Sequence, residues 1–556
     1  MTTLSTPGRL LKSSLRRKGA GRWSLASLGS AAAAAMVVVP VLAAGTSTAP
    51  SAASVPSPLS ALSALARAEV AHYAAALPAG TTVDCTGPAG NPAPGTPAWT
   101  LRDEENQYCA TQRMADEYGS PAFGSTFWSE TPGLFVAQNL AMAETPGHLH
   151  LTLGQLVPGG TTTDPFRTLA RFTAASRGRV TPVSFPANDG ATLNGFVFEP
   201  PASVKGPYPS VVITTGSIQG YQQMYFWAAE GLAEAGYMVM TYDVQGQGNS
   251  DTLPATCTPT AAELQSQQLC AGVPFQQSYN FYQGAEDALN WFLSTPAAPY
   301  SSPAVSGDSY NPDYADVDTA EVGIAGHSLG ASAVSELGQC DPRVKAVVAW
   351  DNLATTSGPC ASQIPAGLPS TAPVDPTNTT PALGINSEYF FNPEPMSAPP
   401  DPQSKAGAFA QLVAAKTDTM QVALRSSMHL EYSYVPYILP ASRLGERVAF
   451  YYTLAWFDRY LRGLASGYNR LVATTFDSSS DVHSIGAGTY SATQAAADPA
   501  DTAAGNVPYR IAGLSAADRL SFYYDSEYSL TPPGGGAKTT CTDMRAGCPA
   551  TAPKYP

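Results

Sequence analysis

The fold of this chain is decided by residues 322–337, which read VGIAGHSLGASAVSEL. Residues 322–325 form a short apolar run typical of a buried strand, and residues 331–337 have the composition of a helix. Between them, residues 326–330 (GHSLG) set Ser328 between two glycines. Glycines at these positions permit a sharp turn from strand to helix that lifts the serine hydroxyl clear of a sheet. The pattern is that of a nucleophile elbow.

The same alternation of strand and helix patterns extends on both sides of this turn. Continuous apolar runs at residues 209–215 and 237–242 predict central parallel strands, with a helix at 221–235 between them. Two alternating runs, at 180–185 and 193–200, predict antiparallel strands at an edge of the sheet. Further helices are predicted at 285–293, 329–337 and 444–461, and further strands at 321–325, 345–350, 381–385 and 420–424. This order predicts an α/β fold with a mostly parallel central sheet and helices on both faces.

From residue 180 to about residue 463, the chain resembles the α/β-hydrolases, most of all the group of secreted esterases, lipases, dienelactone-hydrolase-like enzymes and bacterial polyester hydrolases. The resemblance covers about half of the chain. It rests on the GHSLG turn, on the order of strands, and on residues 242–251, which are similar to the family's Asp-x-Arg-Gly-x-Gly-x-Ser loop. It implies a nucleophilic Ser328 that works with an acid and a histidine, in that order along the chain.

The resemblance also implies where the base and the acid lie. His429 follows the last predicted parallel strand, where the family carries its base. The acid should fall between Ser328 and His429, and we expect it to be Glu388, just past the strand at 381–385, although aspartate is commoner in the family. Asp351, which directly follows the preceding strand, is the alternative acid. More distant alternatives are Asp401 and Glu394.

An oxyanion hole needs two N–H donors. We expect the backbone N–H of Leu329 to be one of them. The resemblance implies that the second comes from residues 215–218, which read TGSI where the family has His-Gly-x. Ser217 matches the donating position, and Ile218 is the alternative. His327 precedes the serine and is expected to line the pocket or to pack in the core.

The composition of the chain limits the classes of partner that we expect it to bind. The chain has 556 residues, a formal net charge of -14 and 44% hydrophobic residues, so we expect a globular protein that binds neither nucleic acid nor anionic membranes. No phosphate-cradling glycine motif follows a strand, and no Cys-x-x-Cys motif occurs. We therefore expect no nucleotide cofactor and no metal ion. The expected partner is a small-molecule, lipid or polymeric ester substrate.

The N-terminal residues predict export. Residues 1–44 combine a basic segment with an apolar stretch that ends in small residues, as in a secretory signal peptide cleaved near Ala43 or Ala44. The apolar stretch is shorter than the roughly 20 residues of a spanning helix, so no membrane anchor is expected after processing. The eight cysteines of an exported chain should be oxidised. One of the possible connectivities joins sequence neighbours, as Cys85–Cys109, Cys257–Cys270, Cys340–Cys360 and Cys541–Cys548.

The predicted domain organisation has five parts. They are a signal peptide at 1–44, a disordered linker at 45–58, an N-terminal extension packed on the core at 59–178, a catalytic domain at 179–464, and a β-rich C-terminal appendage at 465–556. Within the appendage, residues 510–511 and 520–524 have strand-like patterns.

Together these features predict a secreted serine hydrolase that cleaves carboxylic esters through an acyl-enzyme. A serine peptidase or an acyltransferase would use the same triad, and a hydrolase scaffold can also serve binding alone, so these alternatives stay open. Eight aromatic residues near the predicted site could form an apolar substrate pocket or could pack in the core: Tyr221, Tyr225, Phe226, Trp227, Tyr389, Phe390, Tyr432 and Tyr434.

Overall fold

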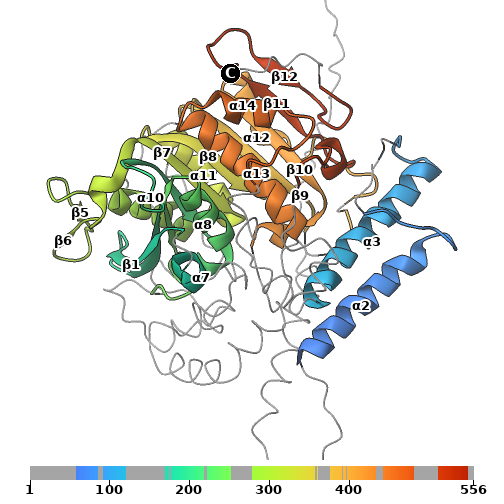
Figure 1. The fold of residues 1–556 in the computed structure, drawn as a ribbon, viewed down its shortest axis with the longest axis horizontal. Helices are drawn as coiled ribbons and strands as arrows, with labels where there is room; N and C mark the ends of the chain where they lie inside the picture. The colour runs from blue at the N-terminus through green and yellow to red at the C-terminus, as the bar shows by residue number, and fades with distance from the viewer. Residues whose placement is uncertain are drawn as a thin grey trace, which may run out of the picture. The chain divides into compact units, whose positions relative to one another are not determined.

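Among the residues that the structure describes, ten strands form one central sheet in the computed structural model, in the order β1-β2-β4-β3-β7-β8-β9-β10-β11-β12 (Figure 1). Their bounds are β1 Arg179–Pro186, β2 Thr192–Glu199, β3 Tyr208–Thr214, β4 Met238–Tyr242, β7 Val317–His327, β8 Val344–Trp350, β9 Ala382–Tyr389, β10 Thr419–Met428, β11 Glu527–Leu530 and β12 Thr539–Cys541. A separate short hairpin joins β5 Tyr300–Ser301 and β6 Asp308–Ser309. The described residues are 58–85, 90, 92–119, 169–174, 177–217, 222–251, 278–356, 360, 376–390, 392–395, 397–433, 443–480 and 511–548.

The strand directions define the fold class. Strands β4, β3, β7, β8, β9 and β10 run parallel to one another, whereas β2 at one edge runs antiparallel to both β1 and β4. At the opposite edge, β11 and β12 add two antiparallel strands. The order β1-β2-β4-β3 followed by β7 to β10, with β2 antiparallel, is that of an α/β-hydrolase fold. The fold predicted from the sequence is confirmed, including its antiparallel edge.

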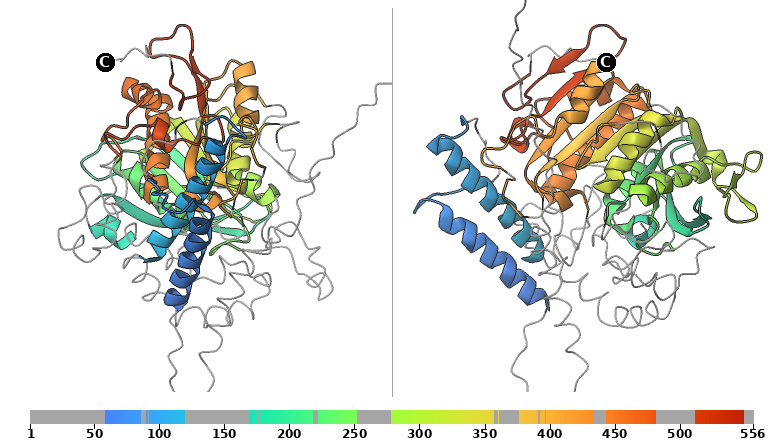
Figure 2. Two further views of the ribbon diagram at one scale, coloured as in Figure 1. Left: turned by 90° about the vertical axis from the view of Figure 1, so that its right-hand side faces the viewer. Right: turned by 180° about the vertical axis from the view of Figure 1, so that it is seen from behind.

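Helices cover both faces of the sheet (Figure 2). On one face, α8 (Phe226–Glu234) and α13 (Arg443–Tyr460) contribute to one hydrophobic core. On the other face, α10, α11 and α12 contribute to a second core. The central strands contribute side chains to both cores, because successive side chains of a strand point to opposite faces of the sheet. The remaining helices are α2 Pro58–Ala76, α3 Pro97–Gly119, α7 Leu169–Ala174, α10 Ser278–Phe292, α11 Leu329–Cys340, α12 Gly407–Ala414 and α14 Ala465–Leu471.

Strand β3 illustrates why the central strands have continuous apolar runs. Val211 and Ile213 lie in the first core, and Val212 between them lies in the second. All three side chains are buried. A strand covered on only one face would need apolar residues at alternate positions, whereas this one needs them at every position.

The C-terminal residues differ from the prediction. Residues 520–524 were expected to form a strand, but only Leu520 forms an isolated bridge, with Leu424. The hydroxyl of Ser521 accepts hydrogen bonds from the N–H groups of Tyr523 and Tyr524, which holds the chain in a local turn. Such side-chain bonds compete with the pairing of a strand. Of the other predicted strand, residue 510 lies outside the described residues and Ile511 is not in a strand.

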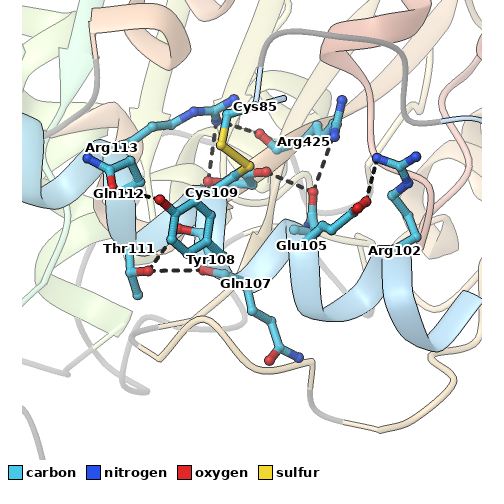
Figure 3. Close-up of a disulfide and its surroundings, with 12 residues drawn as sticks. Cys85, Arg102, Glu105, Gln107, Tyr108, Cys109, Thr111, Gln112, Arg113 and Arg425 are labelled. Carbon is cyan, nitrogen blue, oxygen red and sulfur yellow. Dashed lines mark hydrogen bonds and ion pairs between the residues drawn. A yellow bond between two sulfur atoms is a disulfide. The ribbon is translucent and has the colours of Figure 1, made fainter. Parts of the chain in front are cut away.

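The N-terminal extension contains a long helix, α3, that the sequence analysis did not predict. The disulfide Cys85–Cys109 ties this helix to the chain that precedes it (Figure 3). The guanidinium of Arg113 donates from Nη1 to the carbonyl oxygen of Arg425 at 2.7 Å, so the helix is bonded to strand β10 of the central sheet. The predicted signal peptide and all but the last residue of the predicted linker lie outside the described residues.

Three disulfides are present among the described residues, and each joins cysteines that are neighbours along the chain. They are Cys85–Cys109, Cys340–Cys360 and Cys541–Cys548, as the nearest-neighbour pairing predicts. The fourth predicted pair, Cys257 with Cys270, lies outside the described residues. No helix in the described part of the chain is both long enough and apolar enough to cross a membrane.

Candidate active site

The turn between β7 and α11 has the geometry of a nucleophile elbow. Ser328 has φ 56° and ψ -119°, a left-handed conformation that a residue with a side chain rarely adopts. The two flanking glycines are required by close packing. A Cβ on Gly326 would lie 2.5 Å from the carbonyl oxygen of Gly330, and one on Gly330 would lie 2.3 Å from that of Thr215. The elbow is therefore packed directly against the end of β3.

His429 lies directly after β10 and faces the serine. Its Nε2 is 2.9 Å from Oγ of Ser328, which is hydrogen-bonding distance. The residue opens the short 3-10 helix η5 (His429–Tyr432), and its N–H donates to the carbonyl oxygen of Phe390 at 2.9 Å. The imidazole is thus placed at the carboxyl end of the sheet as the sequence predicts, within reach of the hydroxyl proton.

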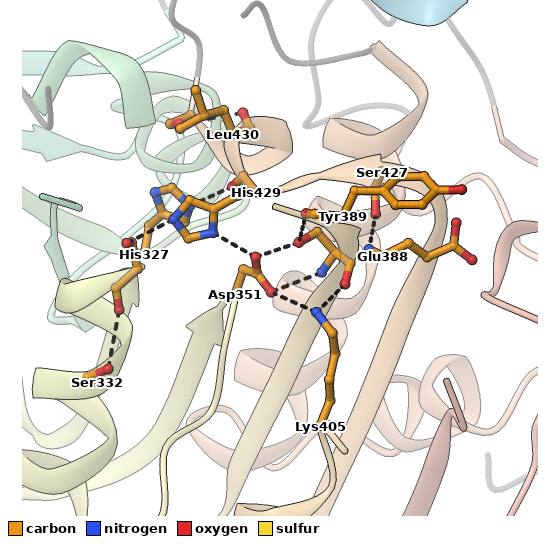
Figure 4. Close-up of polar contacts among 12 residues, drawn as sticks. His327, Ser332, Asp351, Glu388, Tyr389, Lys405, Ser427, His429 and Leu430 are labelled. Carbon is orange, nitrogen blue, oxygen red and sulfur yellow. Dashed lines mark hydrogen bonds and ion pairs between the residues drawn. The ribbon is translucent and has the colours of Figure 1, made fainter. Parts of the chain in front are cut away.

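Asp351, at the end of β8, lies on the other side of the imidazole (Figure 4). Its Oδ2 is 2.7 Å from Nδ1 of His429, and it also accepts a hydrogen bond from the hydroxyl of Ser387. The N–H of Ser387 donates to Oδ1 at 3.1 Å, and Nζ of Lys405 lies 3.7 Å from the same atom. Burial alone would raise the pKa of Asp351, but the Lys405 charge and the hydrogen bonds from His429 and Ser387 hold it well below its usual range.

Glu388, the acid expected from the sequence, does not contact His429. Strand β9 extends to Tyr389, so Glu388 lies within the strand and not in the loop after it. Side chains alternate along a strand. Ser387 bonds to Asp351, and the side chain of Glu388 points away from Asp351 (Figure 4). Its Oε2 accepts hydrogen bonds from Nδ2 of Asn106 and from the N–H of Ser426. The alternative acid, Asp351, occupies the position that was expected of Glu388.

The surroundings of Glu388 also affect the pKa of its carboxyl differently from those of Asp351. Burial raises the pKa of this carboxyl, and the hydrogen bonds from Ser521, Asn106 and Ser426 and the charge of Arg425 offset only part of that effect. Asn106 belongs to α3 and is itself fully buried. Glu388 is therefore an anchor point for the N-terminal extension.

The two expected oxyanion donors lie at the elbow and at the end of β3. Leu329 is the first residue of α11, and an N–H at that position has no partner within its helix. Ser217 follows Gly216, where a Cβ would lie 3.2 Å from Cβ of Ser328, so this loop passes directly against the nucleophile. The alternative donor Ile218 lies outside the described residues.

Most of the aromatic residues expected near the site are core residues. Phe390 differs from them: it is 39% exposed and its ring centroid lies 4.8 Å from that of His429. Tyr221 and Tyr434 lie outside the described residues. The buried ones are Tyr225, Phe226, Trp227, Tyr389 and Tyr432.

Lys405 and Asn106 are two site-region residues that the sequence analysis did not single out. Lys405 stands just before α12 and reaches the triad through space, so no motif marks it. Asn106 lies on α3, whose start was marked by Thr96-Pro97: the Thr96 hydroxyl accepts from the N–H of Trp99 at 3.2 Å, as in a helix cap, and proline is favoured directly after such a cap. Within the described residues, no group of three or more His, Cys, Asp or Glu side chains is placed to hold a metal ion.

Comparisons with known proteins give partial matches. No family model matches the chain. Over 167 residues the chain is 29% identical to Thiohydrolase apmlB of Arthrinium phaeospermum, a match that spans 30% of this chain and 41% of that protein. The chain thus covers less than half the length of this curated relative. A crystal structure assigned as a dienelactone hydrolase from Klebsiella pneumoniae subsp. pneumoniae MGH 78578 matches with a TM-score of 0.33 and 19% identity, over 51% of this chain and 99% of that one.

Proposed function

We propose that this protein is a serine hydrolase of carboxylic esters, with Ser328 as nucleophile, His429 as base and Asp351 as acid. The observation that carries the proposal is the hydrogen-bonded line from Ser328 Oγ to His429 Nε2, at 2.9 Å, and from His429 Nδ1 to Asp351, at 2.7 Å. These three side chains come from the ends of three parallel strands. A buried anionic carboxylate on the far side of the imidazole fixes its tautomer and stabilises the imidazolium.

The proposed reaction follows from these positions. His429 takes the proton of Ser328 as its oxygen attacks the ester carbonyl carbon, and the N–H groups of Leu329 and Ser217 stabilise the oxyanion. The C–O bond to the alcohol then breaks, and the alcohol receives the proton from Nε2 of His429. Water, deprotonated by the same nitrogen, attacks the acyl-enzyme and releases the acid.

The substrate class is the finer part of the proposal. The partly exposed ring of Phe390 beside His429 offers an apolar surface next to the reacting atoms, which suits the apolar part of a lipid or polyester. Thioesters are a second candidate substrate class, favoured by the partial match to a protein named a thiohydrolase. Export of the enzyme is also part of the proposal: three disulfides fit an oxidising compartment, and N-terminal sequencing of the mature chain tests whether it begins near residue 45.

The function is tested by the turnover of p-nitrophenyl esters with acyl chains from short to long, and of thioesters with the same acyl groups. We expect Ser328→Ala to lower kcat by more than about a thousandfold, because loss of a triad member leaves only residual catalysis. The matched control is Ser332→Ala, the same change one turn along α11, which should keep wild-type kcat. If Ser328→Ala kept the kcat of the wild-type enzyme, the proposal would be contradicted.

The same assay separates the other functions that the fold allows. A peptidase would cleave peptide amides faster than the matched esters, and an acyltransferase would form new esters when an acceptor alcohol is added. A protein that only binds its ligand would turn over none of these substrates, and the wild-type protein and Ser328→Ala would then show the same lack of turnover.

A further inference from the structure

His327 is a second histidine in direct contact with the proposed triad, and the reaction described above does not use it. It is the last residue of β7, next to Ser328, and its side chain is 1% exposed. Its ring centroid lies 4.8 Å from that of His429. Both of its ring nitrogens are engaged: Nδ1 is 2.8 Å from the hydroxyl oxygen of Tyr225, and Nε2 is 2.8 Å from the backbone carbonyl oxygen of His429.

The partners of His327 fix which nitrogen carries the proton. A carbonyl oxygen can only accept, so Nε2 must donate to the backbone of His429. In the neutral ring Nδ1 is then an acceptor, and the Tyr225 hydroxyl donates to it. Burial, together with the nearby His429, lowers the pKa of His327 to about 3, so the ring is neutral at neutral pH.

The line of hydrogen bonds continues beyond Tyr225. The hydroxyl oxygen of Tyr225 accepts from the N–H of Gly216 at 2.9 Å. The order of donors is therefore Gly216 to Tyr225, Tyr225 to His327, and His327 to the carbonyl oxygen of His429. At one end of this line, Gly216 directly precedes Ser217, the proposed oxyanion donor. At the other end, the acceptor is the backbone carbonyl oxygen of His429, the proposed base.

We propose that His327 is a positioning residue that sets the distance between the oxyanion loop and the base. This inference rests on the proposed function. Gly216 packs so closely on the ring that a Cβ there would lie 2.9 Å from Nδ1 of His327 and 3.2 Å from Cβ of Ser328. His327 thus joins the loop after β3, the elbow and η5, beyond Thr214 and Gly326, the last residues paired between β3 and β7.

The position of this line predicts which kinetic constant depends on it. Neither His327 nor Tyr225 is placed to contact the ground-state ester, since both side chains are buried beneath the elbow. They influence the placement of the groups that stabilise the transition state. A displacement of about 1 Å in such groups can cost on the order of a hundredfold in rate. Loss of the line should therefore lower kcat and leave KM nearly unchanged.

The test compares His327→Leu with His327→Gln in p-nitrophenyl ester turnover. Leucine fills much of the space without polar atoms, whereas glutamine keeps one acceptor and one N–H donor. We expect kcat of His327→Leu to fall by roughly 30- to 100-fold with KM within about threefold, and His327→Gln to recover most of the loss. Tyr225→Phe should lower kcat in the same way. Adding it to His327→Leu should cost little more, because both changes break one line.

Several results would overturn the inference. They are a kcat for His327→Leu within about threefold of wild type, a loss that appears in KM instead, or a glutamine variant no more active than the leucine variant. Thermal unfolding of each variant establishes that the compared enzymes are folded.

A measurement on the wild-type protein distinguishes a failure of this inference from a failure of the proposed function. The ¹⁵N NMR signals of His327, identified by their loss in His327→Gln, should be those of a neutral ring protonated at Nε2 from pH 5 to 8. An Nδ1-protonated ring would overturn the inference even if esters are hydrolysed. Conversely, absence of any esterase activity with this tautomer present would refute the proposed function and leave the hydrogen-bonded line in place.

Discussion

Asp351 and Glu388 are two buried carboxylates at the same end of neighbouring strands, and they serve different purposes. Asp351 directly follows β8 and contacts His429, whereas Glu388 stands one position before the end of β9 and contacts Asn106 of α3. The pKa of Asp351 is held well below its usual range, and that of Glu388 is raised. Burial raises the pKa of both groups, so the difference comes from their partners.

The comparison teaches that position at a strand end does not by itself make a triad acid. Asp351 faces Lys405 and His429, a histidine that becomes positive in the proposed reaction, and both favour the carboxylate form. Glu388 accepts hydrogen bonds from Ser521, Asn106 and Ser426, and these bonds, together with a smaller effect of the Arg425 charge, lower its pKa by less than burial raises it. The first site suits an acid that must stay ionised, and the second suits a docking contact between the N-terminal extension and the sheet.

Of the substitutions that test this comparison, Asp351→Asn is expected to have the largest effect on kcat. The change keeps the shape of the side chain but removes its charge and favours the wrong tautomer of His429, so kcat should fall about 10⁴-fold. Ester turnover by the purified variant measures it, with thermal unfolding as the folding control. A variant that keeps more than about a tenth of wild-type kcat would break the assignment of the acid.

A smaller catalytic effect and a larger structural one are expected from Glu388→Ala. Removing this acceptor leaves the amide of Asn106 and the N–H of Ser426 buried without it, at about 1–3 kcal/mol for each donor. The free energy of unfolding in urea should fall by that order, while kcat of the folded enzyme stays within about tenfold of wild type. A loss of kcat as deep as that of Asp351→Asn, with stability retained, would reverse the roles of the two acids.

The smallest effect is expected from Lys405→Met, in the pH dependence of kcat/KM. The ammonium of Lys405 lies 3.7 Å from Asp351 and also donates to the carbonyl oxygen of Ser387 at 2.5 Å. Its positive charge lowers the pKa of Asp351. Without Lys405 the pKa of Asp351 rises, so this carboxylate becomes protonated at a higher pH. The fall of kcat/KM on acidification should therefore begin at a higher pH than in the wild-type enzyme, and an onset that is unchanged or lower would contradict this interpretation of the charges.

The sequence was sufficient to predict the central sheet and the elbow, but not which carboxylate contacts His429. Continuous apolar runs such as that of β3 and the two glycines around Ser328 have a direct physical cause in two-sided burial and close packing. Glu388 does not contact His429, because β9 continues four residues beyond its predicted end at Ile385 and Glu388 lies within the strand. Since side chains alternate along a strand, an error in where the strand ends changes which side chain faces the site.

Helix α3 was missed for a different reason. Its docking face mixes apolar residues, Trp99, Ala110 and Met114, with polar ones. Among the polar ones, Asn106 and Arg113 bond to Glu388 and to the backbone of Arg425. A helix face of such mixed composition displays only a weak form of the apolar periodicity by which helices are recognised in a sequence. The contacts of Lys405 and His327 are likewise formed between distant segments, and only the three-dimensional structure brings them together.

The central claim is that Ser328 is made nucleophilic by His429 and Asp351, and covalent labelling tests it most directly. The protein is treated with a fluorophosphonate, digested and analysed by mass spectrometry. The account predicts a single adduct on Ser328, formed much more slowly in Asp351→Asn but at a near-normal rate in Glu388→Ala. An adduct on another serine, or a folded wild-type protein whose Ser328 stays unlabelled, would contradict it.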